Sequence, residues 1–375
     1  AIILFALLQG VYGNMIKNIV SYSSGYLQMH AKNYWEDRSL DDAFVRDTNI
    51  EHTLEALPNI TQVIPRIETF ALASTGELSA SAMLTGMEPD IERHVSNLDK
   101  KVVSGRYLTQ QDNAVLISAG LAKKLQLEVN DTILILTQGY HAANAYGKYA
   151  VKGLVKLGSP DLNNRMVYLP LRAMQYLLSL DDQITAYAFM VDNVKELDAT
   201  KKSIQHTIDT AVFAVMDWKE MMPEMDQLMK SDSSGNKLMV IILYIIISFG
   251  LFSTILMMIT ERQHELGIMI ALGMQKYKLA FVVFLEVIFI AITGVLLGSV
   301  ASLPVIEYLY RHPIQLKGEI AEIYIGYGFE PVMPVSKDPS VFLSQAYIVL
   351  AVACAVAIYP VIKILRMRMI NALSN

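Results

Sequence analysis

Charged residues are scarce in this sequence, and that scarcity argues against an average soluble domain. They make up 18% of the 375 residues, whereas 53% are hydrophobic. An ordinary globular chain carries about 25% charged residues. The net charge of −5 also leaves no basic surface of the kind that binds nucleic acid. Composition therefore favours a membrane protein.

Cysteine is almost absent as well. The single cysteine, Cys354, excludes a disulfide within the chain. It lies in an apolar run, where we expect a small buried hydrophobic side chain rather than a reactive thiol. Any domain outside the cytoplasm must therefore fold by its own core.

Motifs for nucleotide, metal and nucleophile chemistry are also missing. No G-x-x-x-x-G-K-[ST] loop occurs, so the chain cannot cradle ATP phosphates by that device. The histidines are scattered and form no metal-ligand pattern such as H-E-x-x-H, and there is no G-x-S-x-G elbow. We predict no catalytic residue and no metal site in this chain.

Long apolar runs are what the sequence has instead. Three runs, 238–260, 279–306 and 341–362, reach the roughly 20 residues that a helix needs to cross a bilayer. The opening stretch "AIILFALLQGVYGNMIKNIV" is apolar too and lacks the charged start of a signal peptide. We expect it to be a fourth transmembrane helix whose start is missing from the sequence.

The segment between the first two apolar stretches has the character of a water-soluble domain. "ITQVIPRIETFALAS" alternates and is rich in β-branched residues, which predicts strands. "ISAGLAKKLQLEV" places Leu121 and Leu125, with Ile117 as an optional member, at helical spacing. "NDTILILTQG" predicts a strand entered through a turn at Asn130 and Asp131. The mixture of types predicts an α+β fold, and "KSDSSGNK" at 230–237 predicts a polar hinge after it.

Basic residues are densest in the two short segments that follow the second and fourth spans. By the positive-inside rule these segments lie in the cytoplasm, which places the large domain outside. The predicted organisation is a transmembrane helix with its extension (1–28), a periplasmic α+β domain (29–236), transmembrane helix 2 (237–260), a cytoplasmic loop (261–278), transmembrane helix 3 (279–306), a periplasmic loop (307–340), transmembrane helix 4 (341–362) and a cytoplasmic tail (363–375).

The charged loop "ERQHELGIMIALGMQKYKL" predicts a short helix between two spans. Glu261 and Glu265 are four residues apart and share a face, and Gly273 is placed as a helix C-cap. The apolar contacts of this helix would come from Leu266, Met269, Ile270 and Leu272. Spacing alone leaves two alternatives equally open, an amphipathic turn resting on the membrane surface and a helix that docks on a partner.

The same loop resembles the cytoplasmic loop of the FtsX-like/MacB-type ABC transporter permeases. That loop is written E-R-x-x-E-[IL]-G-[IL], followed by a basic residue and A-[IL]-G, and it is the coupling helix that sits in a groove of the ATPase subunit. The resemblance implies an ATPase-coupling role for the matching residues, which are Glu261, Arg262, Glu265, Leu266, Gly267, Ile268, Ala271, Leu272 and Gly273. The sequence departs from the pattern at Ile270, where the family usually has a basic residue.

Other segments are similar to the lipoprotein-releasing (LolC/LolE) subgroup of this family. "SSGYLQMHAKNYWED" at 23–37 carries Gln28 and His30 in the positions that the subgroup's pattern leads one to expect, and "YGFEPVMPVSKDPSVF" also looks like this subgroup. The resemblance implies a non-catalytic permease subunit in the bacterial inner membrane that works by mechanotransmission. Its implied partners are a dimer of ABC ATPase subunits that bind ATP-Mg, a second permease subunit, membrane lipids and a lipoprotein cargo. No cofactor is implied in this chain.

Three further alternatives remain open on sequence alone. They are a MacB-like efflux pump for small toxins or antibiotics, an FtsX-like regulator of a periplasmic cell-wall hydrolase, and a sensor-like membrane receptor. Within the third span, Glu286 is an ionisable residue for which we expect a structural hydrogen bond rather than a proton or substrate role. Gly294 and Gly298 form a G-x-x-x-G pattern that allows close helix packing.

Overall fold

The computed structural model describes residues 2–22, 25–326 and 331–366. The chain divides into two compact units, which we describe separately. The α+β unit comprises residues 14–226 and 316–331, and the helical unit comprises residues 1–13, 227–315 and 332–375. Of the predicted cytoplasmic tail, residues 367–375 lie outside the described residues, as do residues 327–330 of the predicted periplasmic loop.

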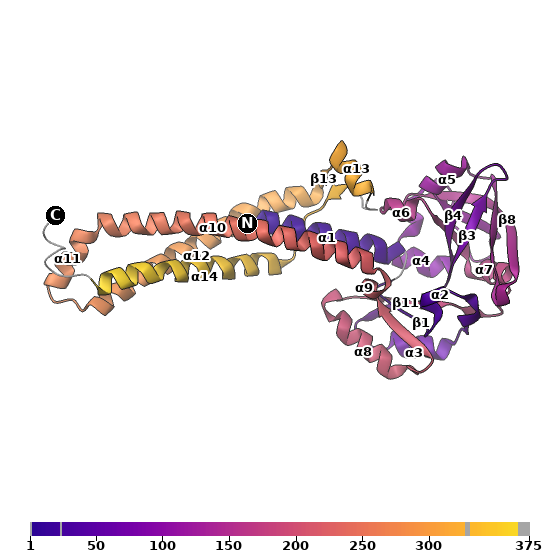
Figure 1. The fold of residues 1–375 in the computed structure, drawn as a ribbon, viewed down its shortest axis with the longest axis horizontal. Helices are drawn as coiled ribbons and strands as arrows, with labels where there is room; N and C mark the ends of the chain where they lie inside the picture. The colour runs from indigo at the N-terminus through magenta and orange to yellow at the C-terminus, as the bar shows by residue number, and fades with distance from the viewer. Residues whose placement is uncertain (1, 23–24, 327–330, 367–375) are drawn as a thin grey trace. The chain divides into compact units, whose positions relative to one another are not determined.

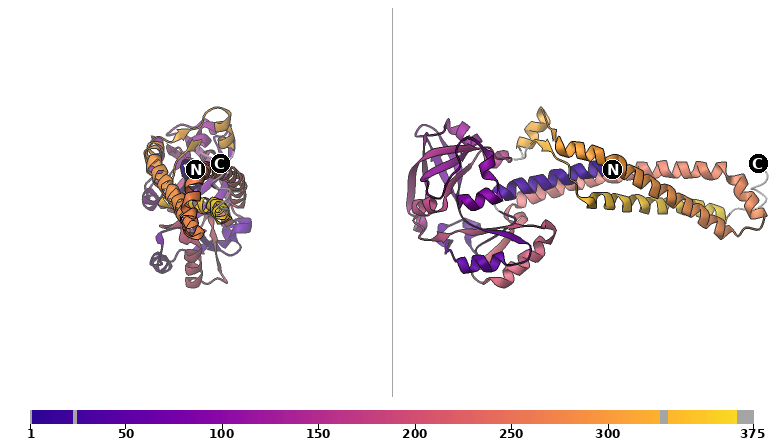
Figure 2. Two further views of the ribbon diagram at one scale, coloured as in Figure 1. Left: turned by 90° about the vertical axis from the view of Figure 1, so that its left-hand side faces the viewer. Right: turned by 180° about the vertical axis from the view of Figure 1, so that it is seen from behind.

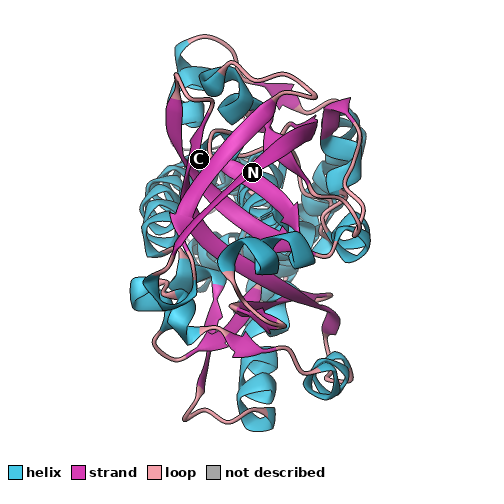
Figure 3. Ribbon diagram, turned by 90° about the vertical axis from the view of Figure 1, so that its right-hand side faces the viewer, coloured by secondary structure: helices cyan, strands magenta, loops and turns pink. Residues whose placement is uncertain are grey.

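The α+β unit is built around one large sheet (Figure 3). Its strands are β1 (Leu27–Ala31), β3 (Ile60–Ser74), β4 (Ser79–Met87), β5 (Val102–Gly105), β6 (Ala114–Ser118), β7 (Thr132–Gln138), β8 (Asn144–Val155), β9 (Met166–Pro170), β11 (Ala186–Val191) and β12 (Phe213–Asp217). A separate small ribbon pairs β2 (Phe44–Val45) with β10 (Gln183–Ile184). The helices are α2 (Tyr34–Asp37), α3 (Thr48–Glu55), α4 (Pro89–Val95), α5 (Ala119–Leu125), α6 (Pro160–Asn163), α7 (Leu171–Leu178), α8 (Leu197–Thr207), α9 (Trp218–Met221) and α13 (Glu319–Gly326).

Part of this sheet closes on itself. Strand β3 pairs with β4, β4 with β9, β9 with β6, β6 with β8, β8 with β7, and β7 returns to β3. The first half of β3 leaves this circuit and pairs with β11, which continues the sheet through β1 to β12. The length of β3 is therefore what joins a closed sheet to an open one. In Figure 3 the magenta strands cross one another, as strands on opposite walls of a closed sheet do.

Most sequence predictions for this unit are confirmed. Residues 60–74 form the single strand β3, and Asn130 takes a left-handed φ of 76° in the turn that leads into β7. Helix α5 buries Leu121 and Leu125. The optional inclusion of Ile117 in that helix was wrong, because Ile117 lies in β6 and is buried in the sheet.

The described residues of the helical unit form four long helices and one short one. They are α1 (Ile2–Tyr22), α10 (Pro223–Glu261), α11 (Gln263–Ala271), α12 (Lys276–Arg311) and α14 (Pro339–Leu365), with a small ribbon of β13 (Ile314–Gln315) and β14 (Val332–Met333) after α12. Both α1 and α10 contribute residues to each of the two units. In Figures 1 and 2, α12 and α14 run side by side and α11 lies between the end of α10 and the start of α12.

Three helices are long and apolar enough to cross a membrane among the residues described: 229–261 of α10, α12 and α14. The first helix offers the shorter apolar stretch Ile2–Ile16, so the fourth predicted span stays a prediction. In an apolar 18-residue stretch of α10, only 6% is buried within the chain. Lipid or another subunit must therefore cover this stretch. The predicted hinge at 230–237 was wrong, because α10 continues through it as helix. Its serines and asparagine have lower helix propensity than their neighbours, but the helix formers on both sides outweigh them.

Packing at the start of α1 depends on one glycine. The loop before α14 passes so close that a Cβ on Gly10 would lie 2.3 Å from the carbonyl oxygen of Pro334. The backbone N–H of Ser336 donates to the carbonyl of Ala6 at 2.9 Å, and Ala6 packs against Val335. Only glycine permits this approach, because its hydrogen takes the place of a side chain.

Candidate functional site

The short helix α11 forms an elbow between α10 and α12. It begins directly after Arg262 and ends at Ala271, with Leu272 as its C-cap. Gly273 follows with φ +95°, and the N–H of Met274 donates to the carbonyl of Met269 at 3.0 Å. This is a Schellman motif, in which a residue with positive φ ends a helix. The predicted helix and the role of Gly273 in ending it are confirmed.

The two faces of α11 differ. Leu266, Gly267 and Ile270 are buried against a cluster that α10, α12 and α14 complete. The members of that cluster are Ile255, Ile259, Leu266, Ile270, Leu279, Ala280, Val283, Val287, Ala357 and Ile364. Two of the residues with an expected coupling role, Leu266 and Gly267, therefore seat the helix on the unit and are not open to a partner.

The opposite face of α11 is uncovered by any described residue of the chain. Its exposed side chains are Glu261, His264, Glu265, Ile268, Ala271 and Leu272. Leu272 is 83% exposed, so the apolar contact expected from it is not made within the described chain and stays a prediction for a partner. The face is acidic at its start and apolar at its end, and residues three or four apart lie together on it. His264 was missed by the sequence interpretation, although its spacing of three from Glu261 and four from Ile268 places it on this face.

Arg262 connects the elbow to the first third of α12. Its Nη1 lies 2.7 Å from Oε1 of Glu286 on α12, and its Nε lies 3.4 Å from Oε2 of Glu265. The two carboxylates raise the pKa of Arg262, with Glu286 the larger cause. Glu286 thus accepts a hydrogen bond from the arginine that directly follows α10, and the structural role expected for it stays a prediction.

The G-x-x-x-G pattern of α12 lines a groove. A Cβ added at Gly294 or Gly298 would meet nothing within 4 Å, so the close packing predicted for them does not occur within the described chain. The groove has a volume of about 270 Å³ and is lined by Ile2, Ile3, Gly294, Val295, Gly298, Ser302, Gln345, Ala346 and Val349. Gln345 is buried and accepts a hydrogen bond from Tyr244 of α10.

Cys354 lies on α14 with its side chain exposed. The expectation of a buried cysteine was therefore wrong within this chain. A membrane helix turns apolar side chains outward to lipid, so an apolar run does not by itself predict burial inside the protein.

The α+β unit buries several polar side chains. Arg66 and Glu92 form an ion pair in which Nε lies 2.8 Å from Oε1, and the two side chains are 2% and 4% exposed. Gln28 and His30, which carry the resemblance to the lipoprotein-releasing subgroup, are completely or almost completely buried on β1. These two residues therefore cannot contact cargo on the surface of this structure, and they belong to the core.

Glu68 is a buried carboxyl group beside these residues. Burial raises its pKa, and the positive charges of Arg66 and Arg38 only partly oppose this. Its Oε1 has no hydrogen-bond partner among the described residues. A carboxyl whose pKa is raised in the folded state favours folding in its protonated form, and that contribution is lost as pH rises through the folded-state pKa.

We therefore expect Glu68→Gln to make the unit more stable than the wild type at neutral pH, because the neutral amide is not ionised in the unfolded chain and so loses no charge on burial. The difference between the two proteins should shrink as pH falls toward the ordinary carboxyl range. Denaturant unfolding followed by tryptophan fluorescence measures this, because both tryptophans, Trp35 and Trp218, lie in the α+β unit. The exposed Glu77→Gln is the control, and an equal gain from it would contradict the assignment.

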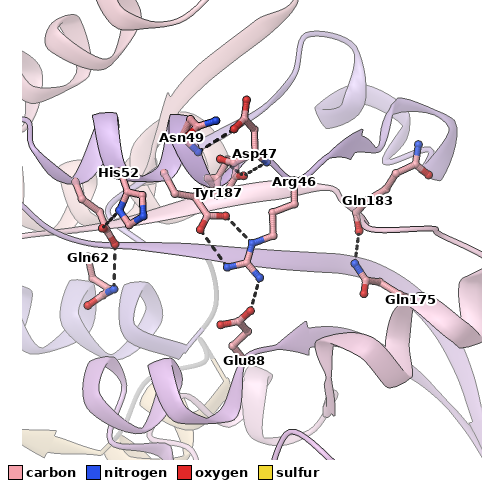
Figure 4. Close-up of polar contacts among 11 residues, drawn as sticks. Arg46, Asp47, Asn49, His52, Gln62, Glu88, Gln175, Gln183 and Tyr187 are labelled. Atoms are coloured by element: carbon pink, nitrogen blue, oxygen red, sulfur yellow. Dashed lines mark hydrogen bonds and ion pairs between the residues drawn. The ribbon is translucent and has the colours of Figure 1, made fainter.

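A second polar junction lies nearer the surface of this unit (Figure 4). The guanidinium of Arg46 donates to both carboxylate oxygens of Glu51 on α3, at 2.6 and 3.0 Å, and to Glu88 before α4. The neighbouring N–H of Asp47 donates to the hydroxyl of Tyr187 on β11. Arg46 thus ties the loop before α3 to α3 and to the start of α4, and Asp47 ties the same loop to the sheet. The exposure of Arg46, 26%, makes it a weaker contributor than the buried pair.

Among the described residues, no group of three or more His, Cys, Asp and Glu side chains could hold a metal ion. The chain thus combines helices of membrane-spanning length with an α+β unit, and its most distinctive exposed helix is a loop element between two such helices. These features define the class of a membrane protein with a large soluble domain.

Two family models match the chain. Residues 1–207 match the MacB-like periplasmic core domain, and residues 237–369 match the FtsX-like permease C-terminal. The chain belongs to the MacB/FtsX-type family of ABC transporter permeases.

Curated relatives include two proteins named lipoprotein-releasing system transmembrane protein LolC. The one from Neisseria meningitidis is 23% identical over 68% of this chain and 63% of its own length, and the one from Xylella fastidiosa is 24% identical over 65% and 60%. A Bacillus subtilis relative named uncharacterized ABC transporter permease YclI is 24% identical over 55% of this chain and 46% of its own. The chain thus spans about 60% of the length of the LolC relatives.

Two solved structures also align with part of this chain. The periplasmic region of MacB from Actinobacillus actinomycetemcomitans aligns with 56% of this chain and 95% of its own, at 15% identity and a TM-score of 0.38. The extracellular domain of the transporter YknZ from Gram-positive bacteria aligns with 51% and 99%, at 17% identity and a TM-score of 0.35. Likenesses at these scores add nothing to what the family models show.

Proposed function

We propose that this chain is the permease subunit of an ATP-driven transporter that releases lipoproteins from the inner membrane toward the outer membrane. A separate ATPase, present as a dimer, binds ATP-Mg and docks on the exposed face of α11. A second permease subunit, identical or related, covers the apolar face of α10. Four spans then place the α+β unit in the periplasm.

The observation that carries this proposal is the exposed face of α11. A helix of nine residues cannot cross a bilayer, yet it leaves acidic and apolar side chains uncovered at the turn between two apolar helices. A surface of that composition suits a protein partner, since uncovered apolar side chains rimmed by polar ones are typical of interaction sites. Because the chain belongs to a family of ABC transporter permeases, we take this partner to be an ATPase.

The mechanism we propose is mechanical. ATP binding closes the ATPase dimer and displaces α11, and the displacement passes through α10 and α12 to the α+β unit. Few polar side chains line the apolar helices, so a polar tunnel through the bilayer is the weaker alternative. The relatives named LolC favour a lipid-anchored protein as the cargo.

Depletion of the chain in its own host tests the cargo. We expect outer-membrane lipoproteins to accumulate in the inner membrane, as fractionation and immunoblotting would show, and re-expression to restore their sorting. Normal lipoprotein sorting under depletion would contradict the cargo. Altered sensitivity to toxins without a sorting defect would favour efflux instead.

A further inference from the structure

Glu286 is a costly residue to place in α12. It is the only charged side chain between Leu279 and Ile306, in one of the helices apolar enough to cross a membrane. An ionised side chain within such a helix is disfavoured unless it is paired. The structure supplies the pair at a distance of 2.7 Å, in Arg262.

This ion pair joins the elbow to α12 at a point well beyond the first residue of α12. Glu286 lies ten residues after Lys276, the first residue of α12, and ten residues of helix are about 15 Å long. Arg262 therefore contacts the body of α12 and not the end to which α11 is joined. Ile259 and Leu266 flank the arginine in sequence, Val283 and Val287 flank the glutamate, and all four are buried in one cluster.

The covalent connection between α11 and α12 is a turn. It passes through Leu272, Gly273, Met274 and Gln275, with Gly273 at a positive φ. A turn hinged on glycine transmits displacement poorly, because its dihedral angles can absorb the movement. A side-chain contact from the elbow to Glu286, in the first third of α12, bypasses that hinge.

We propose that Arg262 and Glu286 are positioning residues that make α12 follow α11. This inference rests on the proposed function, because it assumes that an ATPase displaces α11. Arg262 also reaches Glu265 on the exposed face at 3.4 Å, so one guanidinium links the surface open to a partner with α12. Planar guanidinium groups hold such two-sided geometry better than an ammonium does.

The test compares charge reversals in the full chain purified with its co-purifying ATPase in nanodiscs. The variants are Arg262→Glu, Glu286→Arg and the double reversal. A mismatched double, Arg262→Glu with Glu307→Arg, is the control, since Glu307 pairs with Lys337 and Arg311 instead. With Cys354 replaced by serine, spin labels at Ile246 of α10 and Leu297 of α12 report the movement of α12, and labels at Ile246 and Gln263, which lies outside the docking face, report that of α11.

In the wild type we expect a non-hydrolysable ATP analogue to change both distances, by about 1–2 Å or more. In each single reversal the α11 distance should still change while the α12 change is lost. The double reversal of Arg262 and Glu286 should restore the change in the α12 distance, whereas the mismatched double variant should not. An undiminished α12 change in the single variants, or no recovery in the double reversal, would overturn the inference while leaving ATPase docking intact. Absence of any co-purifying ATPase from the wild type would instead overturn the proposed function, and the inference with it.

Discussion

Glu265→Lys combined with Leu272→Asp is expected to release the ATPase from the membrane chain without unfolding it. The two side chains are exposed on one face of α11, one in its acidic half and one in its apolar half. Reversing a charge and burying a carboxylate at an interface should together cost about 2 kcal/mol or more, which weakens binding about 30-fold. Neither change touches the buried cluster beneath the helix, so the chain should still insert and fold.

Co-purification of the ATPase with the tagged chain measures this effect. The matched control applies the same two changes on α13, as Glu322→Lys with Ile323→Asp, where an acidic and an apolar side chain are likewise exposed. Retention of the ATPase by the α11 variant at the level of the control would count against docking on this face. Gly267 is unsuitable for such a test, because it lies on the buried face.

Glu92→Gln is expected to have the largest effect on stability. It removes the carboxylate with which Arg66 forms its buried ion pair, and losing one partner of a buried ion pair costs about 3–5 kcal/mol. The free energy of unfolding of the α+β unit should fall by that amount in denaturant titrations followed by the fluorescence of Trp35 and Trp218.

Two further variants separate charge from packing. Arg66→Met with Glu92→Leu removes both charges and should recover most of the loss, since an apolar pair of similar volume fills such a site well. Glu51→Gln weakens the partly exposed Arg46 junction and should cost only about 1 kcal/mol. An equal loss in Glu51→Gln and Glu92→Gln would show that burial does not set the energy of these pairs.

The sequence predicts the local elements of this chain well. Alternation along 60–74 identifies β3, and glycine after an apolar stretch identifies the end of α11 at Gly273. The three long apolar helices follow from length and hydropathy alone. All of these elements depend on interactions between residues close in sequence, and such interactions leave a periodic pattern of apolar and polar residues.

What the sequence could not predict depends on contacts between distant residues. Nothing in the order of residues shows that β7 returns to β3 and closes the sheet, or that Arg262 reaches Glu286. For the same reason the spacing along α11 could not show that Leu266 and Ile270 contact the helical unit while Leu272 is exposed. Apolar composition also failed to predict the exposure of Cys354. Apolar side chains face lipid as well as a protein core, so an apolar run does not show which of the two surrounds a residue.

The central claim is that the exposed face of α11 binds a separate ATPase, and a photo-crosslinking amino acid placed at Leu272 tests it most directly. In membranes of the native host, illumination should join this position to a second chain that hydrolyses ATP, whereas the same probe at the buried Leu266 should give no such product. A crosslink from Leu272 only to lipid or to the chain itself would contradict the account.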